Sequence, residues 1–552
     1  QEASGFKINA TKSVLMGVSL PDRVQRCVRA LGRFSWASTS LRYLGVNITP
    51  NVEDLYSNNH LQMLATLKGE MSRWSRLPLS WTGRINSVKM SLLPKLLYLF
   101  YALPVTIPSA FFRELRSAIT RYVCTRSSVR VSYHSLSRNK ESGGWGLPDV
   151  ELYYRAAQLR VLVDWSTRET QKLWVHMDRA VAGHALWDLI WLRKEHRKPN
   201  VYLSTPTATT LRVWDAAGVS RRFTTYPSPY TPIHLNPEFT PGMDHVSFGA
   251  WYRGDCIMIR DLFSEGEVLG FTDCRQSFGV QETERFHYFQ IRHWVMQRDN
   301  REAATRDLLP FERWMEGAVG SRGVTSQLYK LLCAPLAGAQ PRYKGAWEAL
   351  AQCSFTQKQM DFVWRDLHAS TLSLSAREAH YKILTDWYRY PVKLHRIYPA
   401  VSPNCWRGCA ALGDAHHIWW SCPLVQPFWE EVMEALTLML GYPVPADPAV
   451  LLVGVRPPTL RAQSKQDRKL MWGCLGAAKT AIAFYWKKSQ TPPISLWWAR
   501  LWSLLAMEKL AINVQARHAQ FQDTWAPLID YLNTGLPSRL QPPRIRSLGL
   551  FA

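Results

Sequence analysis

The sequence has few of the features that mark membrane or secreted proteins. Its most apolar run, LLYLFYALPVTIP at residues 96–108, is too short to span a bilayer and contains two prolines. The opening residues, QEASGFKINATKS, are polar throughout and are not typical of a signal peptide. The ten cysteines are mostly scattered through 552 residues, unlike a secreted disulfide framework. We therefore expect a protein without membrane association, in the cytoplasm and nucleus.

Acidic residues are scarce relative to basic ones. The chain has 43 Asp and Glu against 67 Lys and Arg, which gives a net charge of +24. Residues 1–165 hold +12 of this charge and residues 453–552 hold +10. Two basic ends around a nearly neutral middle indicate contact with a polyanion. A solvated cationic surface without a specific partner is the alternative.

Aromatic side chains are abundant, with 25 Trp, 22 Tyr and 20 Phe. Since 47% of the residues are hydrophobic, sizeable cores can form, and a disordered chain is excluded. Rings among basic residues also suit stacking on nucleobases. Most single rings are nevertheless expected to lie in cores.

Hydrophobic periodicity predicts a mainly helical chain that begins with short strands. Apolar stripes at helical spacing run through residues 64–74, 110–123 and 424–440. Residues 199–245 are rich in Pro, Thr and Ser, and we expect a linker or loosely packed region there.

The segment NCWRGCAALGDAHHIWWSC at residues 404–422 concentrates three cysteines and two histidines. Cys405, Cys409, His417 and Cys422 have the spacing C-x3-C-x7-H-x4-C, and three thiolates with one imidazole suit tetrahedral zinc. The zinc would be structural, because no coordination position stays open. His416 is a rival ligand, and reduced, packed thiols are the alternative to a metal site.

This cluster, followed by LVQPFW, resembles the cysteine-rich motif near the C-terminus of LINE-type non-LTR retrotransposon reverse transcriptases. Other segments resemble parts of these enzymes in the same order. SGFKINATKS (4–13) resembles the stretch after the catalytic palm hairpin, and LRYLGVNI (41–48) the primer-grip strand. WTGRINSVKMSLLPKLLYLFYALP (81–104) resembles the thumb helices, and SGGWGLPDVELYYRAA (142–157) the segment after them. The resemblance is weakest at 199–340.

The resemblance implies a mainly α fold with a small β remnant of the palm, a helical thumb, and a helical C-terminal region with a zinc knuckle. The implied domains are the end of the palm and primer grip (1–50), the thumb helical bundle (51–165), a linker or helical middle region (166–340), a C-terminal helical segment with the zinc knuckle (341–452) and a basic, Trp-rich tail (453–552).

The catalytic centre of such an enzyme is missing from this sequence. A reverse transcriptase needs palm aspartates, including a Y-x-D-D turn, to hold two Mg²⁺ ions about 3.5–4 Å apart. No two aspartates are adjacent here, and the first residue is Gln rather than Met. We expect a piece of a longer reverse transcriptase, whose remainder would be its partner and would hold the Mg²⁺. Alone, this chain should not polymerise DNA.

The residues that the resemblance places on nucleic acid lie in four segments. They are Lys7 and Lys12 after the palm, Tyr43 and Gly45 in the primer grip, Arg84 and Lys89 on the thumb, and Trp406, Arg407 and Trp419 around the zinc knuckle. The lysines and arginines would contact phosphates, and the tryptophans would stack on unpaired bases. The alternatives are a plain surface position for Lys12, strand packing for Tyr43, and packing of a knuckle tryptophan against the helix at 424–440.

Farther along, basic residues predict a diffuse basic surface without assignable contacts. They are Arg456, Arg461, Lys465, Arg468, Lys469, Lys487 and Lys488.

The predicted function is to grip an RNA template and a DNA primer during target-primed reverse transcription. One alternative is a stand-alone zinc-knuckle protein that binds RNA or DNA and derives from such an element. Another is a structural module whose cluster holds a protein-binding helix. Binding that weakens steeply as salt rises would favour nucleic acid over a protein interface. The sequence leaves the preferred RNA and the oligomeric state open.

Overall fold

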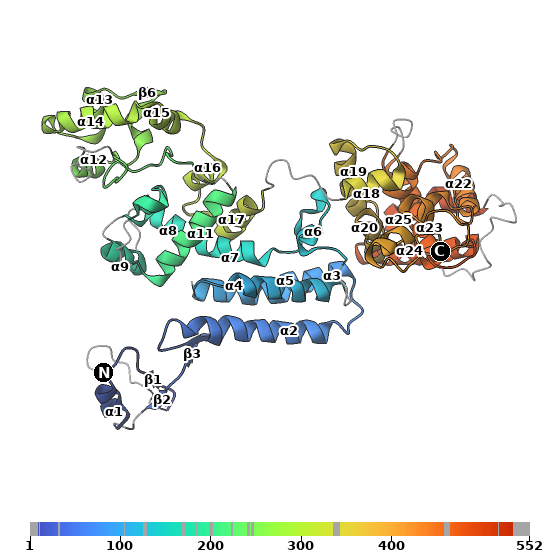
Figure 1. The fold of residues 1–552 in the computed structure, drawn as a ribbon, viewed down its shortest axis with the longest axis horizontal. Coiled ribbons are helices and arrows are strands. Elements are labelled where there is room, and N and C mark those ends of the chain that lie inside the picture. The colour runs from blue at the N-terminus through green and yellow to red at the C-terminus, as the bar shows by residue number, and fades with distance from the viewer. Residues whose placement is uncertain are drawn as a thin grey trace. The chain divides into compact units, whose positions relative to one another are not determined.

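Helices dominate this protein, whose structure is a computed structural model (Figure 1). The residues that it describes are 9, 11–30, 32, 34–103, 105–124, 130–167, 172–182, 185–197, 203–221, 223, 225–239, 243, 248–334, 343–456, 464–516 and 518–533. Within them, three two-stranded sheets make up the β structure. The predicted mainly α fold with a small β remnant is therefore confirmed.

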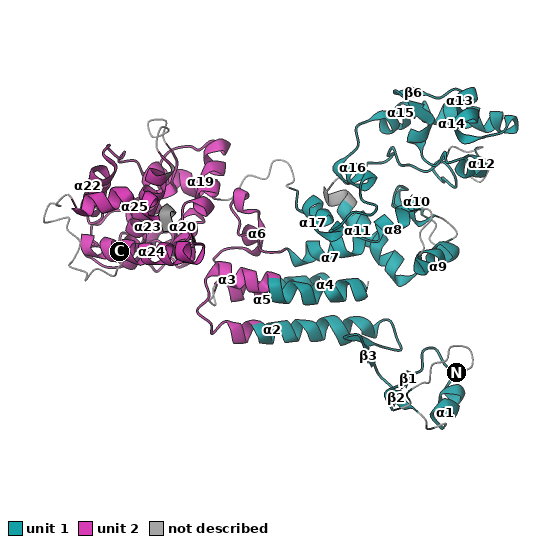
Figure 2. Cartoon of the chain, turned by 180° about the vertical axis from the view of Figure 1, so that it is seen from behind, with its two compact units in different colours: residues 1–70, 90–116, 149–337 teal, residues 71–89, 117–148, 338–552 magenta. Residues whose placement is uncertain are grey.

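The chain divides into two compact units (Figure 2). The first unit comprises residues 1–70, 90–116 and 149–337, and the second comprises residues 71–89, 117–148 and 338–552. Each unit is thus assembled from segments that are distant in sequence. The domain boundaries drawn from the sequence stay predictions.

Among the described residues, the strands lie in the first unit. They are β1 (Val14–Met16), β2 (Ser35–Ala37), β3 (Leu41–Tyr43), β4 (Val46–Ile48), β5 (Phe263–Ser264) and β6 (Glu267–Val268). β1 and β2 pair in parallel, whereas β3–β4 and β5–β6 are antiparallel hairpins. At the tip of the β3–β4 hairpin, Leu44 has φ 47° and Gly45 has φ 84°. Two successive left-handed residues are typical of a tight two-residue hairpin turn, and glycine adopts this conformation without strain.

The first unit also holds helices before, within and after the predicted thumb. They are α1 (Asp22–Ala30), α4 (Leu93–Ala102), α7 (Val150–Leu159), α8 (Leu162–Ser166), α9 (Leu173–Ala182), α10 (Leu186–Leu189), α11 (Thr205–Arg221), α12 (Gly249–Arg253), α13 (Phe271–Phe278), α14 (Arg285–Val295), α15 (Arg298–Thr305), α16 (Pro310–Glu316) and α17 (Val324–Cys333). α7 packs against α4, α11 and α17. Tyr153 of α7 stacks on Tyr329 of α17, and Gln158 donates to the Phe100 carbonyl at 2.8 Å.

Helices α2 (Gln62–Trp74) and α5 (Ser109–Cys124) each run from the first unit into the second. Their predicted apolar stripes are confirmed: Leu64, Leu67 and Met71 are at most 4% exposed, and Leu115 and Ile119 are fully buried. The basic side chains between these stripes, such as Arg73 and Arg113, are exposed, as the sequence pattern predicts.

Helix α11 shows that the expectation of a loosely packed region at 199–245 is wrong for residues 205–221. Thr207 and Thr210 are 1% exposed, and so is Trp214. The Trp214 indole donates to the Ile190 carbonyl at 2.8 Å. In α11, threonines occupy buried positions that apolar residues usually fill. The sequence therefore lacks the apolar periodicity by which an amphipathic helix is recognised.

Helices are the main regular structure in the described part of the second unit. Its helices are α3 (Trp81–Ser87), α6 (Tyr133–Ser137), α18 (Lys344–Ala351), α19 (Gln357–Ala369), α20 (Leu374–Leu384), α21 (Pro391–Ile397), α22 (Gln426–Leu440), α23 (Lys465–Phe484), α24 (Ile494–Val514) and α25 (His518–Asn533). Helices α22 to α25 pack against one another. Trp429, Trp497 and Trp498 lie in this core at 1% exposure or less. These tryptophans of the C-terminal region are therefore core residues.

Several single turns connect these helices. The π-helical turns are η1 (Tyr56–Leu61), η2 (Val88–Leu92), η7 (His417–Ser421) and η8 (Ala449–Val453), and the 3₁₀ turns are η3 (Lys140–Ser142), η4 (Lys194–His196), η5 (Ile259–Leu262) and η6 (Glu282–Glu284). None of the described helices combines the length and the low polarity that crossing a bilayer requires.

Candidate metal centre and nucleic-acid-binding residues

Cys405, Cys409, His417 and Cys422 come together in the second unit and could hold a metal ion. One ligand atom from each of the four lies within 4.8 Å of all the others. The Sγ of Cys409 is 3.1 Å from Nε2 of His417. Two sulfurs on a tetrahedral metal with bonds near 2.3 Å lie about 3.8 Å apart, a separation that falls within this 4.8 Å limit. We call these four residues the Cys/His cluster.

Backbone hydrogen bonds fold the first half of the cluster into a tight reversal. Asn404 and Leu412 form an isolated antiparallel bridge, and the Cys405 N–H donates to the Ala411 carbonyl at 2.8 Å. Between the first two cysteines, Gly408 has φ 89°, a left-handed conformation that glycine takes without strain. The chain thus reverses its direction tightly around Gly408.

The second half of the cluster is helical. The Asp414 carboxylate accepts the N–H of His417 at 2.7 Å and so caps the turn η7, which carries His417. The Cys422 N–H donates to the His417 carbonyl at 3.0 Å, in the π-helical pattern. This turn brings the imidazole and the last thiol back toward the first two. Asp414 was not among the predicted site residues, although Asp three positions before a helical residue is a recognisable capping signal.

The local environment favours the metal-binding form of two ligands. Burial pushes the pKa of Cys409 upward, but hydrogen bonds from the Ala411 N–H and the neighbouring thiols outweigh it and lower that pKa. Burial also lowers the pKa of His417, and Arg407 and His416 act in the same direction, whereas the Asp414 carboxylate opposes them. Burial raises the pKa of Cys405 to about 12, so a metal that binds here must displace its proton.

The structure decides between the two adjacent histidines. Nδ1 of His416 donates to the Leu350 carbonyl at 2.9 Å, which directs this ring away from the thiols. His417 is therefore the histidine of the cluster.

Two of the three predicted contacts around the knuckle are buried. Arg407 is 3% exposed and donates from Nη1 to the Ile418 carbonyl at 2.9 Å, and Trp419 is 3% exposed. The Trp419 ring packs against Tyr388 and Trp486. Because neither side chain reaches solvent, the prediction that they contact RNA is wrong for this fold. Trp406 is half-buried, and its indole donates to the Trp486 carbonyl.

The position of Arg84 also corrects its predicted role as a phosphate contact. Its side chain is 3% exposed, and its guanidinium donates to four backbone carbonyls, those of Ser75, Leu77, Leu79 and Tyr122, at 3.0–3.2 Å. Four of its five N–H donors are used in this way, and burial keeps the group away from a phosphate in solution. The guanidinium instead ties together the ends of α2, α3 and α5.

The other predicted contacts differ in exposure. Lys7 lies outside the described residues. Lys12 is exposed, and Tyr43 is 60% exposed beside the hairpin turn at Gly45. Lys89 is half-buried, and burial followed by repulsion from Lys140 lowers its pKa. Lys12, Tyr43 and Gly45 belong to the first unit, whereas Lys89 and Trp406 belong to the second.

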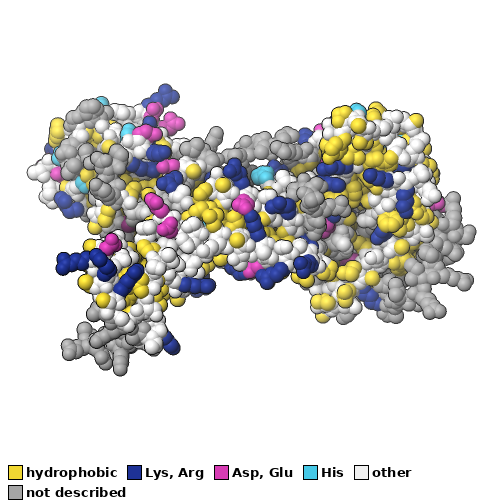
Figure 3. Space-filling view, turned by 60° about the horizontal axis from the view of Figure 1, so that its bottom comes forward, with side chains coloured by type: hydrophobic (Ala, Val, Ile, Leu, Met, Phe, Trp, Pro, Cys, Tyr) yellow, Lys and Arg dark blue, Asp and Glu magenta, His cyan; other side chains and the backbone are white. Residues whose placement is uncertain are grey.

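Basic side chains remain exposed next to the cluster. Lys487 lies over the Trp406 ring, 5.6 Å from its centroid, and Lys488 follows it. The Val392 N–H of α21 donates to the carbonyl of Gly413, which lies between the cluster residues in sequence. On the same helix, Arg396 is exposed. Figure 3 shows Lys and Arg side chains spread over the visible face among fewer Asp and Glu. No family model matches the chain.

Proposed function

We propose that this chain carries the thumb and zinc-knuckle region of a non-LTR retrotransposon reverse transcriptase, and that it binds the RNA template and the DNA primer. The convergence of the Cys/His cluster is the observation that carries this proposal. Three thiols and one neutral imidazole are the donor set of a structural zinc site without an open position. The basic side chains beside the cluster supply the affinity for phosphates.

Arg407 has a part in this proposal that differs from its predicted one. A zinc ion with three thiolates has a net charge of −1, which is costly to bury unless it is compensated. Arg407 is buried and close enough to His417 to lower its pKa, and its Nε and Nη2 are buried without a partner among the described residues. Its positive charge would offset that of the zinc centre.

Trp406 and Lys487 are the residues best placed to meet RNA at the cluster. The ring is half-buried rather than enclosed, and an exposed ammonium lies over it. A base could stack on such a ring while the lysine contacts its phosphate. In the first unit, exposed Tyr43 and Leu44 at the hairpin tip are available to a primer end.

The test is RNA affinity of the full chain, measured by fluorescence anisotropy over a range of salt concentrations. Wild type should bind RNA with an affinity that falls steeply as salt rises, and Cys409→Ser should lose zinc and bind RNA about tenfold more weakly. His416→Ala is the matched control and should behave as wild type. Equal RNA affinity of wild type and zinc-free Cys409→Ser would refute the RNA role of the cluster, and binding insensitive to salt would refute nucleic-acid binding through phosphates.

A further inference from the structure

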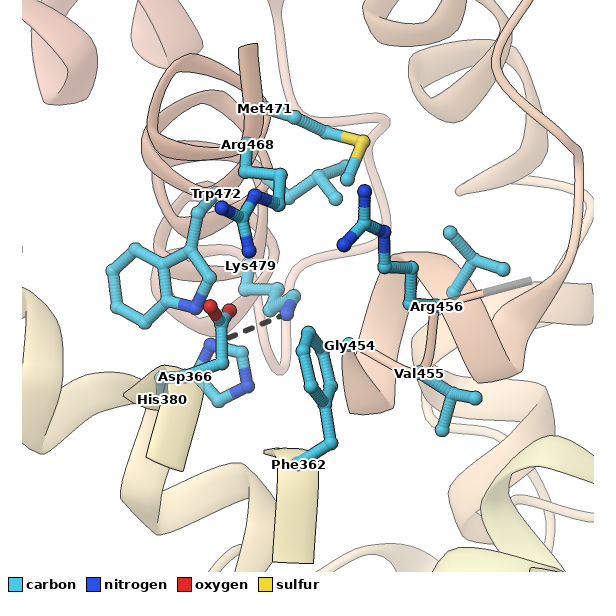
Figure 4. A pocket seen from close by; sticks show the side chains of 12 residues that line it. Phe362, Asp366, His380, Gly454, Val455, Arg456, Arg468, Met471, Trp472 and Lys479 are labelled. Atoms are coloured by element: carbon cyan, nitrogen blue, oxygen red, sulfur yellow. Dashed lines mark hydrogen bonds between the residues drawn. The ribbon is translucent and has the colours of Figure 1, made fainter. Parts of the chain in front are cut away.

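A second group of buried and partly buried charges lies in the second unit, in a pocket lined by α19, α20, α23 and the residues after η8 (Figure 4). Arg456, Arg468 and Lys479 are its cations and Asp366 is its carboxylate. We call it the cationic pocket. Arg456 and Arg468 belong to the predicted diffuse basic surface, but the fold directs both guanidinium groups toward one space.

The floor of the cationic pocket is a fully buried lysine. Lys479 is 2% exposed, donates to the Leu452 carbonyl at 2.9 Å, and lies 3.4 Å from Nδ1 of His380. Burial lowers the pKa of Lys479 to about 7, and Asp366 opposes this effect. Burial is the main cause that holds the pKa of His380 well below its usual range, and the charge of Lys479 acts in the same direction. The His380 ring therefore adds no positive charge to the pocket.

The positive charges outnumber the negative one. Burial raises the pKa of Asp366, while a hydrogen bond from Ser370 and the charges of Arg468, Arg456 and Lys479 lower it. One carboxylate thus faces three cations. In addition, Nε of Arg468 is buried and has no acceptor among the described residues. Both observations favour a second anion between the two guanidinium groups.

The size and walls of the pocket limit what this anion can be. The cavity has about 30 Å³ of room for water centres, which is space for roughly two waters. Only a small group can enter, while the rest of a ligand stays outside. The Arg468 guanidinium approaches from one side, the Arg456 guanidinium from another, and the Lys479 ammonium from below. A tetrahedral anion, with oxygens in several directions, matches this arrangement better than a planar carboxylate.

We propose that the cationic pocket binds a single phosphate group, of a nucleotide or of a nucleic-acid strand, through the N–H donors of Arg456, Arg468 and Lys479. The proposal rests on the charges of the pocket and does not depend on zinc or on RNA binding at the Cys/His cluster. Trp472 and Phe362 form apolar walls beside the phosphate.

Calorimetric titration of the full chain with inorganic phosphate tests the site, slightly below pH 7, at constant ionic strength set by chloride. We expect one phosphate per chain. Arg468→Gln should weaken binding at least about tenfold, because it removes a charge-assisted donor. Asp366→Asn should strengthen binding about tenfold, because it removes a repelling charge. Opposite effects of two substitutions in one pocket cannot both come from a damaged fold.

Arg365→Gln is the matched control, since Arg365 precedes Asp366 on α19 but is exposed and outside the pocket. It should leave phosphate affinity within about twofold of wild type. An absence of saturable phosphate binding, equal losses in Arg365→Gln and Arg468→Gln, or weaker binding by Asp366→Asn would each overturn the proposal. Acetate that binds as tightly as phosphate would overturn the assignment to phosphate.

Oligonucleotides with and without a 5′-phosphate identify the source of the group. Tighter binding of the phosphorylated strand that is lost in Arg468→Gln assigns a terminal phosphate. Equal binding of both strands, weakened equally by Arg468→Gln, assigns an internal phosphodiester. Zinc-free Cys409→Ser should keep its affinity for inorganic phosphate, so this proposal and the proposed function can fail separately.

Discussion

The Cys/His cluster and the cationic pocket are two buried polar sites of opposite character. The cluster gathers three thiols and an imidazole, which suit a cation, whereas the pocket gathers three cations around one carboxylate and suits an anion. The cluster ligands lie between residues 405 and 422 on a loop and one turn. The pocket residues lie between 362 and 479, mostly on packed helices. The first site therefore depends on its ligand for its shape, whereas the helix packing shapes the second.

Metal removal should have the largest effect on local folding. If it had no effect, the contrast between a ligand-shaped cluster and a packing-shaped pocket would be wrong. Structural zinc contributes apparent free energies on the order of 10 kcal/mol to small metal-bound segments. A chelator should therefore abolish the protection of amides 404–422 against hydrogen exchange, while α23 keeps most of its protection. Equal loss in α23 would show that the pocket needs the metal as well.

Lys479 gives the pocket a pH dependence that sharpens the contrast. The unfolded chain keeps Lys479 protonated up to about pH 10.4, whereas the folded chain releases that proton near pH 7. Stability should therefore rise with pH between about 7 and 10, by up to about 5 kcal/mol, and this gain should be lost as pH falls from 10 back to 7. Asp366, His380, Arg456 and Arg468 face this ammonium.

Urea unfolding of wild type and Lys479→Met, at several pH values in phosphate-free buffer, measures this contribution. The difference in unfolding free energy between the two proteins should grow with pH through this window. Parallel curves for wild type and Lys479→Met would contradict the burial of a titrating lysine.

Arg84 is another buried cation, and it differs from the pocket cations because four of its five N–H donors are bonded to backbone carbonyls. Arg84→Gln would leave most of the four carbonyls without their donor and should lower the free energy of unfolding by about 3 kcal/mol. Exposed Arg76→Gln is the control and should change it by less than about 0.5 kcal/mol. If Arg84→Gln kept wild-type stability but reduced the salt dependence of RNA binding, the original prediction of a phosphate contact would be restored.

Substitution of the tryptophans near the cluster should have the smallest effect, and only Trp406 should affect RNA binding. Trp406→Ala should weaken RNA binding by about tenfold, because base stacking contributes on the order of 1–3 kcal/mol. Trp419→Ala should instead lower thermal stability, since its ring is buried between Tyr388 and Trp486. Anisotropy and thermal unfolding of both variants separate the two roles. Weaker RNA binding by both at unchanged stability would contradict the buried position of Trp419.

The sequence predicted the elements whose signal is local. The helices over residues 62–74, 109–124 and 426–440 followed from apolar spacing, and the ligand set followed from four residues close in sequence. What it could not predict was the direction of a side chain relative to distant segments. Arg84 resembles a surface arginine until α2 and α5 bring carbonyls to it. Arg456, Arg468 and Lys479 meet only through helix packing, and the choice between His416 and His417 needed the position of the Leu350 carbonyl.

The most direct test of the central claim is the zinc content of the purified full chain, measured by elemental analysis for wild type, His417→Ala and His416→Ala. The account predicts one zinc per chain in wild type and in His416→Ala, and none in His417→Ala. No zinc in any of the three would make the cluster a set of packed thiols, and zinc lost with His416 rather than His417 would contradict the ligand geometry.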